Sequence, residues 1–147
     1  VYPVSAVLAN NEVMDVIKPG QHGSTFGGNP LAAAVAVAAL EVVRNENLAE
    51  NAATLGLLFR EKIGEYVRTS SIVSLVRGKG LLNAIVINDT EDSDTAWNIC
   101  LRLRDNGLLA KPTHGNIIRF APPLVMNREQ LLDCVSIITR TLQEFEK

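Results

Sequence analysis

A polar, glycine-rich stretch followed at once by an alanine- and valine-rich run constrains this chain more than any other feature. The stretch reads His22-Gly-Ser-Thr-Phe-Gly-Gly-Asn-Pro30, and the apolar run covers residues 31–40. Asn29 followed by Pro30 is typical of a helix N-cap with proline in the first turn. Such a loop presents free N–H groups and the positive end of the helix dipole to an anion. The sequence therefore predicts a loop–helix unit with the chemistry of a phosphate site.

Ser24 and Thr25 add hydroxyl donors to this loop, and we expect Thr25 to be the main side-chain contact to a phosphate. The loop does not end in Gly-Lys-Ser or Gly-Lys-Thr, so it is not a nucleoside-triphosphate loop. Nor does its spacing match the dinucleotide-binding fingerprint. A surface turn that needs glycine only in order to bend remains the alternative.

Composition excludes several classes of function. The chain has 147 residues and a net charge of −2, which argues against general nucleic-acid binding. The apolar run at 31–40 is too short to span a bilayer, so we expect no membrane partner. Cys100 and Cys134 fall on expected helices, and with two histidines they show no metal-ligand spacing. We therefore expect reduced thiols and no metal site.

Hydrophobic periodicity predicts an α/β chain. We expect strands at 4–9, 72–77, 81–87, 108–110 and 117–120, and helices at 12–17, 31–44, 48–67, 95–105 and from the cap at Asn127 to about 145. The change from long helices to alternating short elements places a domain boundary near residue 69. Because the chain opens inside an expected core strand, we expect it to be part of a longer protein.

Arg119 lies in the otherwise apolar strand at 117–120, just before Pro122-Pro123. A guanidinium is costly to bury without a carboxylate partner, and no acidic residue lies nearby in sequence. Its planar fork binds a carboxylate through two parallel hydrogen bonds. Two interpretations stay open: Arg119 holds the carboxylate of a ligand, or it forms a structural ion pair on an edge strand.

The other polar candidates are weaker. We expect Arg77 to cover apolar surface with its stem and Lys111 to be exposed. Lys79 lies between two glycines. Such a pair is able to hold an anion, but the simpler interpretation is that it lets the chain twist between two strands. His22 and His114 occupy polar loops, and the spacing supports no Ser-His-Asp or Cys-His set.

Four motifs together resemble the class III, fold type I aminotransferases, which depend on pyridoxal 5′-phosphate. They are the loop at 22–30, Arg77-Gly-Lys-Gly-Leu-Leu82, Gly107-Leu-Leu-Ala-Lys-Pro-Thr-His114 and Ile118-Arg-Phe-Ala-Pro-Pro-Leu124. The first motif is shared by many members of the family, whereas the third is more specific to those that act on ornithine. The resemblance implies the end of the large cofactor domain at 1–68 and a small α+β C-terminal domain at 69–147.

The resemblance also implies roles for matching residues. Ser24 and Thr25 would bind the cofactor phosphate, in a loop that reaches the neighbouring subunit's site in a homodimer or higher homo-oligomer. Arg119 would hold a carboxylate of 2-oxoglutarate, glutamate or ornithine. The lysine that binds the cofactor covalently would lie upstream of Val1. We therefore expect no catalytic residue here and no transamination by these residues alone.

The implied activity is transfer of the δ-amino group of ornithine to 2-oxoglutarate, giving glutamate-5-semialdehyde and glutamate, in proline and arginine metabolism. The implied compartment is the cytoplasm or the mitochondrial matrix. Two alternatives remain. One is another class III ω-aminotransferase, acting on acetylornithine or 4-aminobutyrate, and the other is a non-catalytic homologue that keeps the fold.

Overall fold

The computed structural model describes residues 3–146, and these form two compact units. The first ends at Glu46 and the second begins at Asn47. The expected boundary near residue 69 concerns the domains of an assembled subunit and stays a prediction. Each unit is described by itself below.

The first unit holds two helices, α1 (Asn11–Met14) and α2 (Pro30–Asn45). Asn10 caps α1, because its side-chain oxygen accepts a hydrogen bond from the backbone N–H of Val13 at 3.2 Å. Pro30 occupies the first turn of α2, where its missing N–H costs no helical hydrogen bond. The helix expected at 31–44 is confirmed, and the one expected at 12–17 forms but ends at Met14.

The expected strand at 4–9 is absent from the structure. These residues carry no regular secondary structure, and Val7 and Leu8 are 83% and 95% exposed. A strand exists only when its N–H and C=O groups pair with a neighbour, and the described part of the first unit contains no other strand. The apolar residues of this segment alone are therefore not enough to predict a strand. Val1 and Tyr2 lie outside the described residues.

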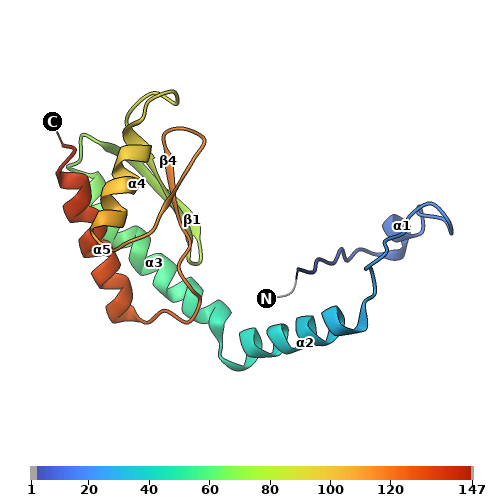
Figure 1. The fold of residues 1–147 in the computed structure, drawn as a ribbon. Helices are drawn as coiled ribbons and strands as arrows, with labels where there is room; N and C mark the ends of the chain where they lie inside the picture. Colours follow the sequence, from blue (N-terminus) through green and yellow to red (C-terminus); the bar gives the residue numbers. More distant parts are fainter. Residues whose placement is uncertain (1–2, 147) are drawn as a thin grey trace. The chain divides into compact units, whose positions relative to one another are not determined.

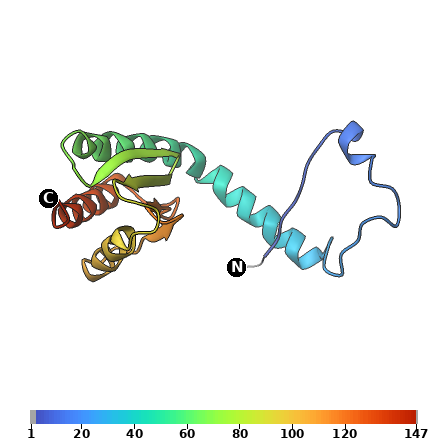
Figure 2. The same ribbon diagram turned by 90° about the horizontal axis from the view of Figure 1, so that it is seen from above.

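The second unit is a two-layer sandwich of three helices on one antiparallel sheet (Figure 1). Its elements are α3 (Leu48–Val67), β1 (Val73–Lys79), β2 (Leu82–Ile87), α4 (Thr95–Asp105), β3 (Lys111–Thr113), β4 (Ile117–Phe120) and α5 (Arg128–Gln143). The strand order is β1-β2-β4-β3, so β2 and β4 are interior. Seen from above, α5 lies between α3 and α4 on the same side of the sheet (Figure 2).

The core of this unit lies between the helices and one face of the sheet. Ile63 of α3, Ile85 of β2, Ile118 of β4 and Ile138 of α5 are at most 1% exposed. Side chains alternate across a strand, so the neighbours of Ile85 and Ile118 point to the opposite face. That opposite face is covered by no helix of residues 47–146. Among the described residues, no helix is long and apolar enough to cross a membrane.

One strand lies later in the chain than expected. Residues 108–110 carry no strand, whereas β3 forms directly after them, at Lys111–Thr113. Gly107 adopts a φ of 90°, and the N–H of Leu108 still donates to the carbonyl of Leu103 at 2.9 Å. This is a Schellman end of α4, so residue 108 is occupied in closing the helix. Pairing with β4 begins only beyond it.

Candidate functional site

The loop before α2 is a tight turn held by its own polar groups. The hydroxyl of Ser24 accepts a hydrogen bond from the N–H of Gly27 at 3.0 Å. The N–H of Asn29 donates to the carbonyl of Phe26 at 3.2 Å, and Gly28 adopts a φ of 73°. Only glycine takes that conformation without strain. The sequence therefore specifies the shape of this loop through one hydroxyl and one glycine.

The first N–H groups of α2 are already partly satisfied. The side-chain oxygen of Asn29 accepts from the N–H of Leu31 at 2.9 Å and from that of Ala32 at 3.1 Å. An anion here would depend on side-chain hydroxyls as well as on the helix end. Thr25 is exposed, and within residues 3–146 its hydroxyl has no hydrogen-bond partner. Ser24, but not Thr25, lines a hollow of about 310 Å³ beside the loop.

Arg119 lies on an interior strand and points away from the core. Its neighbours Ile118 and Phe120 are buried, at 0% and 6% exposure, whereas Arg119 itself is exposed. The cost of burying a guanidinium without a carboxylate partner therefore does not arise at Arg119. The alternative of an ion pair on an edge strand is not found either, because β4 lies between β2 and β3 and no ion pair of Arg119 occurs within residues 3–146.

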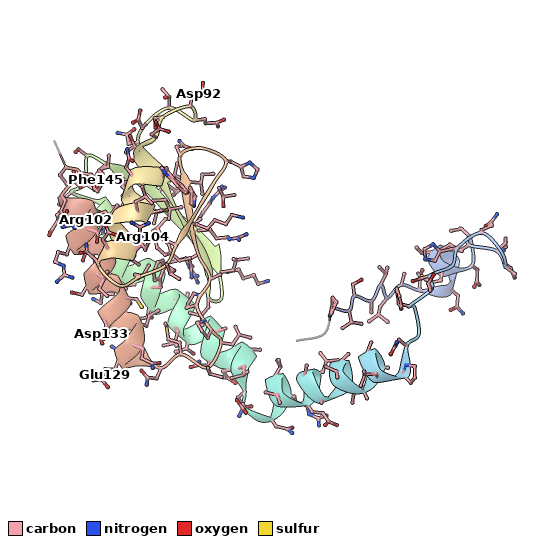
Figure 3. All side chains as sticks on the ribbon, viewed as in Figure 1. Asp92, Arg102, Arg104, Glu129, Asp133 and Phe145 are labelled. Carbon is pink, nitrogen blue, oxygen red and sulfur yellow. The ribbon has the colours of Figure 1, made fainter. Side chains whose placement is uncertain are left out.

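Three further cations share the open face with Arg119. The register pairs Arg77 with Ala84, Ala84 with Arg119, and Arg119 with Lys111, so these side chains form one row across four strands. Lys79, two residues beyond Arg77 on β1, projects from the same face. Figure 3 shows nitrogen-tipped side chains on the side of the sheet away from α4 and α5. We call Arg77, Lys79, Lys111 and Arg119 the cation face.

Sequence reasoning missed Arg77 and Lys111 as members of a site. Arg77 and Lys79 line, with Arg119, a shallow hollow of about 310 Å³ on this face. The pairing of residue 77 with residue 84 follows from a short hairpin turn and was within reach of the sequence. The pairing of β2 with β4 joins strands that are not consecutive, and no local pattern reports it.

The β1–β2 turn that carries Lys79 is fixed to α3 by a small polar network. Arg60 Nη1 donates to the carbonyl of Gly80 at 3.1 Å and to Asn83 Oδ1 at 2.7 Å. Asn83 Nδ2 donates to the same carbonyl at 3.1 Å, and Asn83 is only 2% exposed. A buried amide with its partners satisfied specifies one arrangement of the turn. The network therefore holds the end of the cation face in register.

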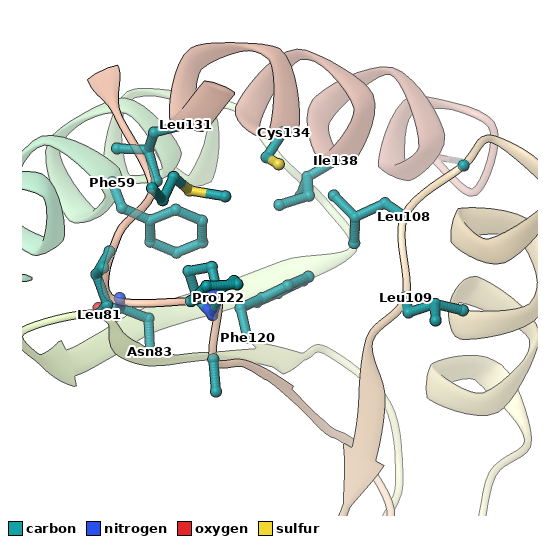
Figure 4. Close-up of a pocket in the computed structure, with 14 residues that line it drawn as sticks. Phe59, Leu81, Asn83, Leu108, Leu109, Phe120, Pro122, Leu131, Cys134 and Ile138 are labelled. Atoms are coloured by element: carbon teal, nitrogen blue, oxygen red, sulfur yellow. The ribbon is translucent and has the colours of Figure 1, made fainter. Parts of the chain in front are cut away.

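An apolar cavity of about 300 Å³ lies between the helices and the sheet (Figure 4). Phe59, Phe120 and Ile138 line it, with Asn83 as a polar group and Cys134 at its wall. Burial, and then the charge of Asp133, raise the pKa of the Cys134 thiol. A thiol with a raised pKa is a weak nucleophile at neutral pH. The cavity thus offers apolar volume but no acid, base or nucleophile.

The described residues contain no group of three His, Cys, Asp or Glu side chains that is able to hold a metal ion. His114 adopts a φ of 50° in the exposed loop between β3 and β4, and His22 is exposed in the glycine loop. The residues with ligand-binding chemistry are therefore the hydroxyls at 24–25 in the first unit and the cation face in the second.

Comparison with known families gives one clear match. The family model described as aminotransferase class III matches residues 2–142, which is nearly the whole chain. Ornithine aminotransferase, mitochondrial, of Rattus norvegicus is 58% identical over 144 residues, covering 98% of this chain and 32% of the rat protein. The chain thus spans about a third of the length of this curated relative.

Solved structures of similar proteins share the fold. The acetylornithine aminotransferase from Elizabethkingia anophelis superposes with a TM-score of 0.88 at 69% identity, covering 94% of this chain and 34% of that one. The ornithine delta-aminotransferase of Plasmodium falciparum gives a TM-score of 0.86 at 48% identity, covering 94% of this chain and 35% of that one. These likenesses confirm the α/β fold expected from the sequence.

Proposed function

Because the chain belongs to the class III aminotransferase family, we propose that it forms the C-terminal third of an enzyme that transfers the δ-amino group of ornithine to 2-oxoglutarate. The products are glutamate-5-semialdehyde and glutamate. The observation that carries this proposal is Arg119, an exposed guanidinium on an interior strand with no ion-pair partner within residues 3–146. A carboxylate substrate supplies the partner that the described chain lacks.

In this proposal Arg119 orients the substrate. Its two N–H groups bind one carboxylate in a fixed plane, which restricts how the reacting carbon is presented. Ile118 and Phe120 are locked in the core on either side, so the backbone under Arg119 is rigid. A rigid strand holds a binding residue more accurately than a loop does. The protein thus contributes orientation rather than bond chemistry at this position.

The family depends on pyridoxal 5′-phosphate, and the residues before α2 fit its phosphate. Thr25 offers an exposed hydroxyl without a partner in residues 3–146, and Ser24 keeps a proton to donate while its oxygen accepts from Gly27. When bound, the cofactor supplies an electron sink for removal of a proton from the carbon that carries the amino group. Ser24 and Thr25 would hold its phosphate, across the interface of a homodimer.

Further parts of the proposal follow from the family. We retain the expectation that the lysine that binds the cofactor covalently lies upstream of residue 1, so residues 1–147 alone would not transaminate. Residues 1–68 would complete the large domain, and 69–147 would form the small domain. For the compartment we retain the cytoplasm and the mitochondrial matrix; the name of the rat relative supports a mitochondrial location.

The test uses the full-length enzyme carrying these residues. Arg119→Leu should raise the KM for 2-oxoglutarate about 100-fold, because it removes a charge-assisted bidentate contact, while Arg119→Lys should recover only part of that loss. Thr25→Val should weaken cofactor retention on dialysis about tenfold, and Thr25→Ser should restore it. An unchanged KM in Arg119→Leu removes Arg119 from the substrate site.

A second candidate is transfer of the terminal amino group of N-acetylornithine, favoured by the 69% identity to a structure described as an acetylornithine aminotransferase. A panel of ornithine, N-acetylornithine and 4-aminobutyrate, each with 2-oxoglutarate, separates these activities. A kcat/KM for ornithine at least tenfold above the others supports the first proposal. No turnover with any of them supports a non-catalytic homologue.

A further inference from the structure

The cation face places like charges directly opposite one another. Arg119 and Lys111 are cross-strand partners, and Arg77 lies in the same row with only Ala84 between it and Arg119. Strands are spaced by about 4.8 Å, so along the sheet Lys111 lies about 5 Å and Arg77 about 10 Å from Arg119. Like charges in directly opposed positions destabilise a sheet. The row is therefore an arrangement that folding alone disfavours.

Within the strands of residues 47–146, no acidic side chain offsets this charge on the same face. The outward positions of the four strands are Leu75, Arg77, Lys79, Leu82, Ala84, Val86, Lys111, Thr113, Ile117 and Arg119. None is an Asp or Glu, and none of the four cations forms an ion pair within residues 3–146. The helix layer behaves differently, since there Arg102 pairs with Glu144 at 2.6 Å. The outward positions of the sheet therefore carry four cations and no carboxylate.

The shape of the face also leaves room for an anion. Ala84, the smallest outward residue of the row, lies between the two guanidinium-bearing positions. It forms the floor of the hollow of about 310 Å³ that Arg77, Lys79 and Arg119 line. A larger residue at 84 would fill this space. The hollow therefore brings an anion bound at Arg119 within range of Arg77 and Lys79, and Lys111 is the cross-strand neighbour of Arg119.

The two substrates of the proposed reaction differ in sign. The oxo acid 2-oxoglutarate carries two negative charges, whereas ornithine carries one net positive charge. Cations around Arg119 attract the first and repel the second, and both effects decrease with salt. A cluster of one sign also raises the rate at which an oppositely charged ligand arrives.

We propose that Arg77 and Lys111 are specificity-determining residues that select the substrate at Arg119 by its charge. They favour the dianionic oxo acid over the cationic amino acid, and Lys79 adds to the same field. This inference rests on the proposed function, since it takes Arg119 as the carboxylate site. It adds that neighbours of Arg119, which make no bidentate contact themselves, contribute to discrimination between the two half-reactions.

The test measures kcat/KM for each substrate separately in the full-length enzyme. Lys111→Met should lower kcat/KM for 2-oxoglutarate about fivefold and Arg77→Met about threefold, while that for ornithine stays level or rises about twofold. Lys111→Arg keeps the charge and should keep the ratio. The drop should shrink at roughly 0.3 M salt, where the screening length is short.

The control is Arg128→Met, which removes the same charge from the start of α5 in the helix layer. This variant should keep kcat/KM for 2-oxoglutarate and for ornithine within about 1.5-fold of the unmodified enzyme, since its charge lies on the other side of the sheet. An equal loss for both substrates in Lys111→Met, or no change in their ratio, overturns the inference. An unmodified enzyme that turns over none of the tested amino donors refutes the proposed function instead, so the two failures are distinguishable.

Discussion

The carbonyl oxygen of Gly80 lies only 1.8 Å from the point that a Cβ atom on Gly56 would occupy. Gly56 is in the middle of α3 and Gly80 is in the β1–β2 turn, so a helix and a hairpin meet backbone to backbone. The same carbonyl accepts the hydrogen bonds of Arg60 and Asn83. The missing side chain at residue 56 is therefore a condition for the polar network that fixes the turn.

Gly56→Ala should destabilise the protein by about 3 kcal/mol, because the added methyl overlaps a backbone atom that cannot move without breaking that network. Urea unfolding measures the loss. Gly64→Ala is the matched control in the same helix, since its Cβ would meet only Val76 at 3.9 Å. It should stabilise by about 0.5–1 kcal/mol through helix propensity. Equal effects at both sites would contradict the close approach.

Asn83→Leu should destabilise the protein by about 2 kcal/mol, since it removes one hydrogen bond from Arg60 and one from the Gly80 carbonyl at a buried position. Arg60→Met alone removes two of the three bonds. Because both changes act on one network, the double variant should lose less than the sum of the single losses. Strict additivity in urea unfolding would show that the three groups act independently.

The long helices of the second unit could be predicted from the sequence because their signals are local. Apolar residues at helical spacing predicted α3 at its observed limits, 48–67. The cap at Asn127 predicted the start of α5, where the structure shows both hydrogen bonds of a capping box with Gln130, at 2.9 and 3.0 Å. Caps and periodicity are read within a few residues, so no tertiary partner is needed to recognise them.

What the sequence could not provide depends on distant partners. The apolar residues at 4–9 form no strand, because a strand needs a pairing partner. The strand β3 begins at Lys111 rather than at 108, because residue 108 closes the end of α4. The chemistry of Arg119 was recognisable from residue type, but its neighbours were not. Arg77 joins it only through the pairing of β2 with β4, which no local pattern encodes, and Lys111 was missed because β3 was expected at 108–110.

Burial raises the pKa of the Cys100 thiol to about 11, so at pH 8 very little of it is thiolate. The pKa of the half-buried Cys134 is raised as well. We expect a thiol reagent at pH 8 to modify Cys134 slowly and Cys100 only when the domain unfolds. Mass spectrometry of the labelled peptides, with and without urea, measures the extent of labelling at each cysteine. Fast labelling of Cys100 in the native protein would contradict its burial.

The carboxylate of Glu146 ties the C-terminal end of the described chain to the segment before β1. It accepts hydrogen bonds from the hydroxyls of Ser70 and Ser71, each at 2.6 Å, from the N–H of Ser71 at 2.7 Å, and from the hydroxyl of Tyr66. Partial burial raises the pKa of Glu146, but these donors outweigh it and lower the pKa to about 2. Burial and the nearby carboxylate raise the pKa of Tyr66 to about 12.

Glu146 should therefore contribute to the free energy of unfolding, and this contribution should decrease in acid. Its folded pKa of about 2 lies below its ordinary value of 4.5, so its contribution is complete above about pH 5 and lost as the pH falls toward 2. Urea unfolding should show Glu146→Gln less stable by about 1 kcal/mol at pH 7, since solvent screening limits the loss, and equal to the unmodified protein near pH 2. Glu61→Gln, which removes an exposed carboxylate with no such donors, should show no comparable convergence. A Glu146→Gln deficit that persists at pH 2 would mean that the side chain acts through packing rather than charge.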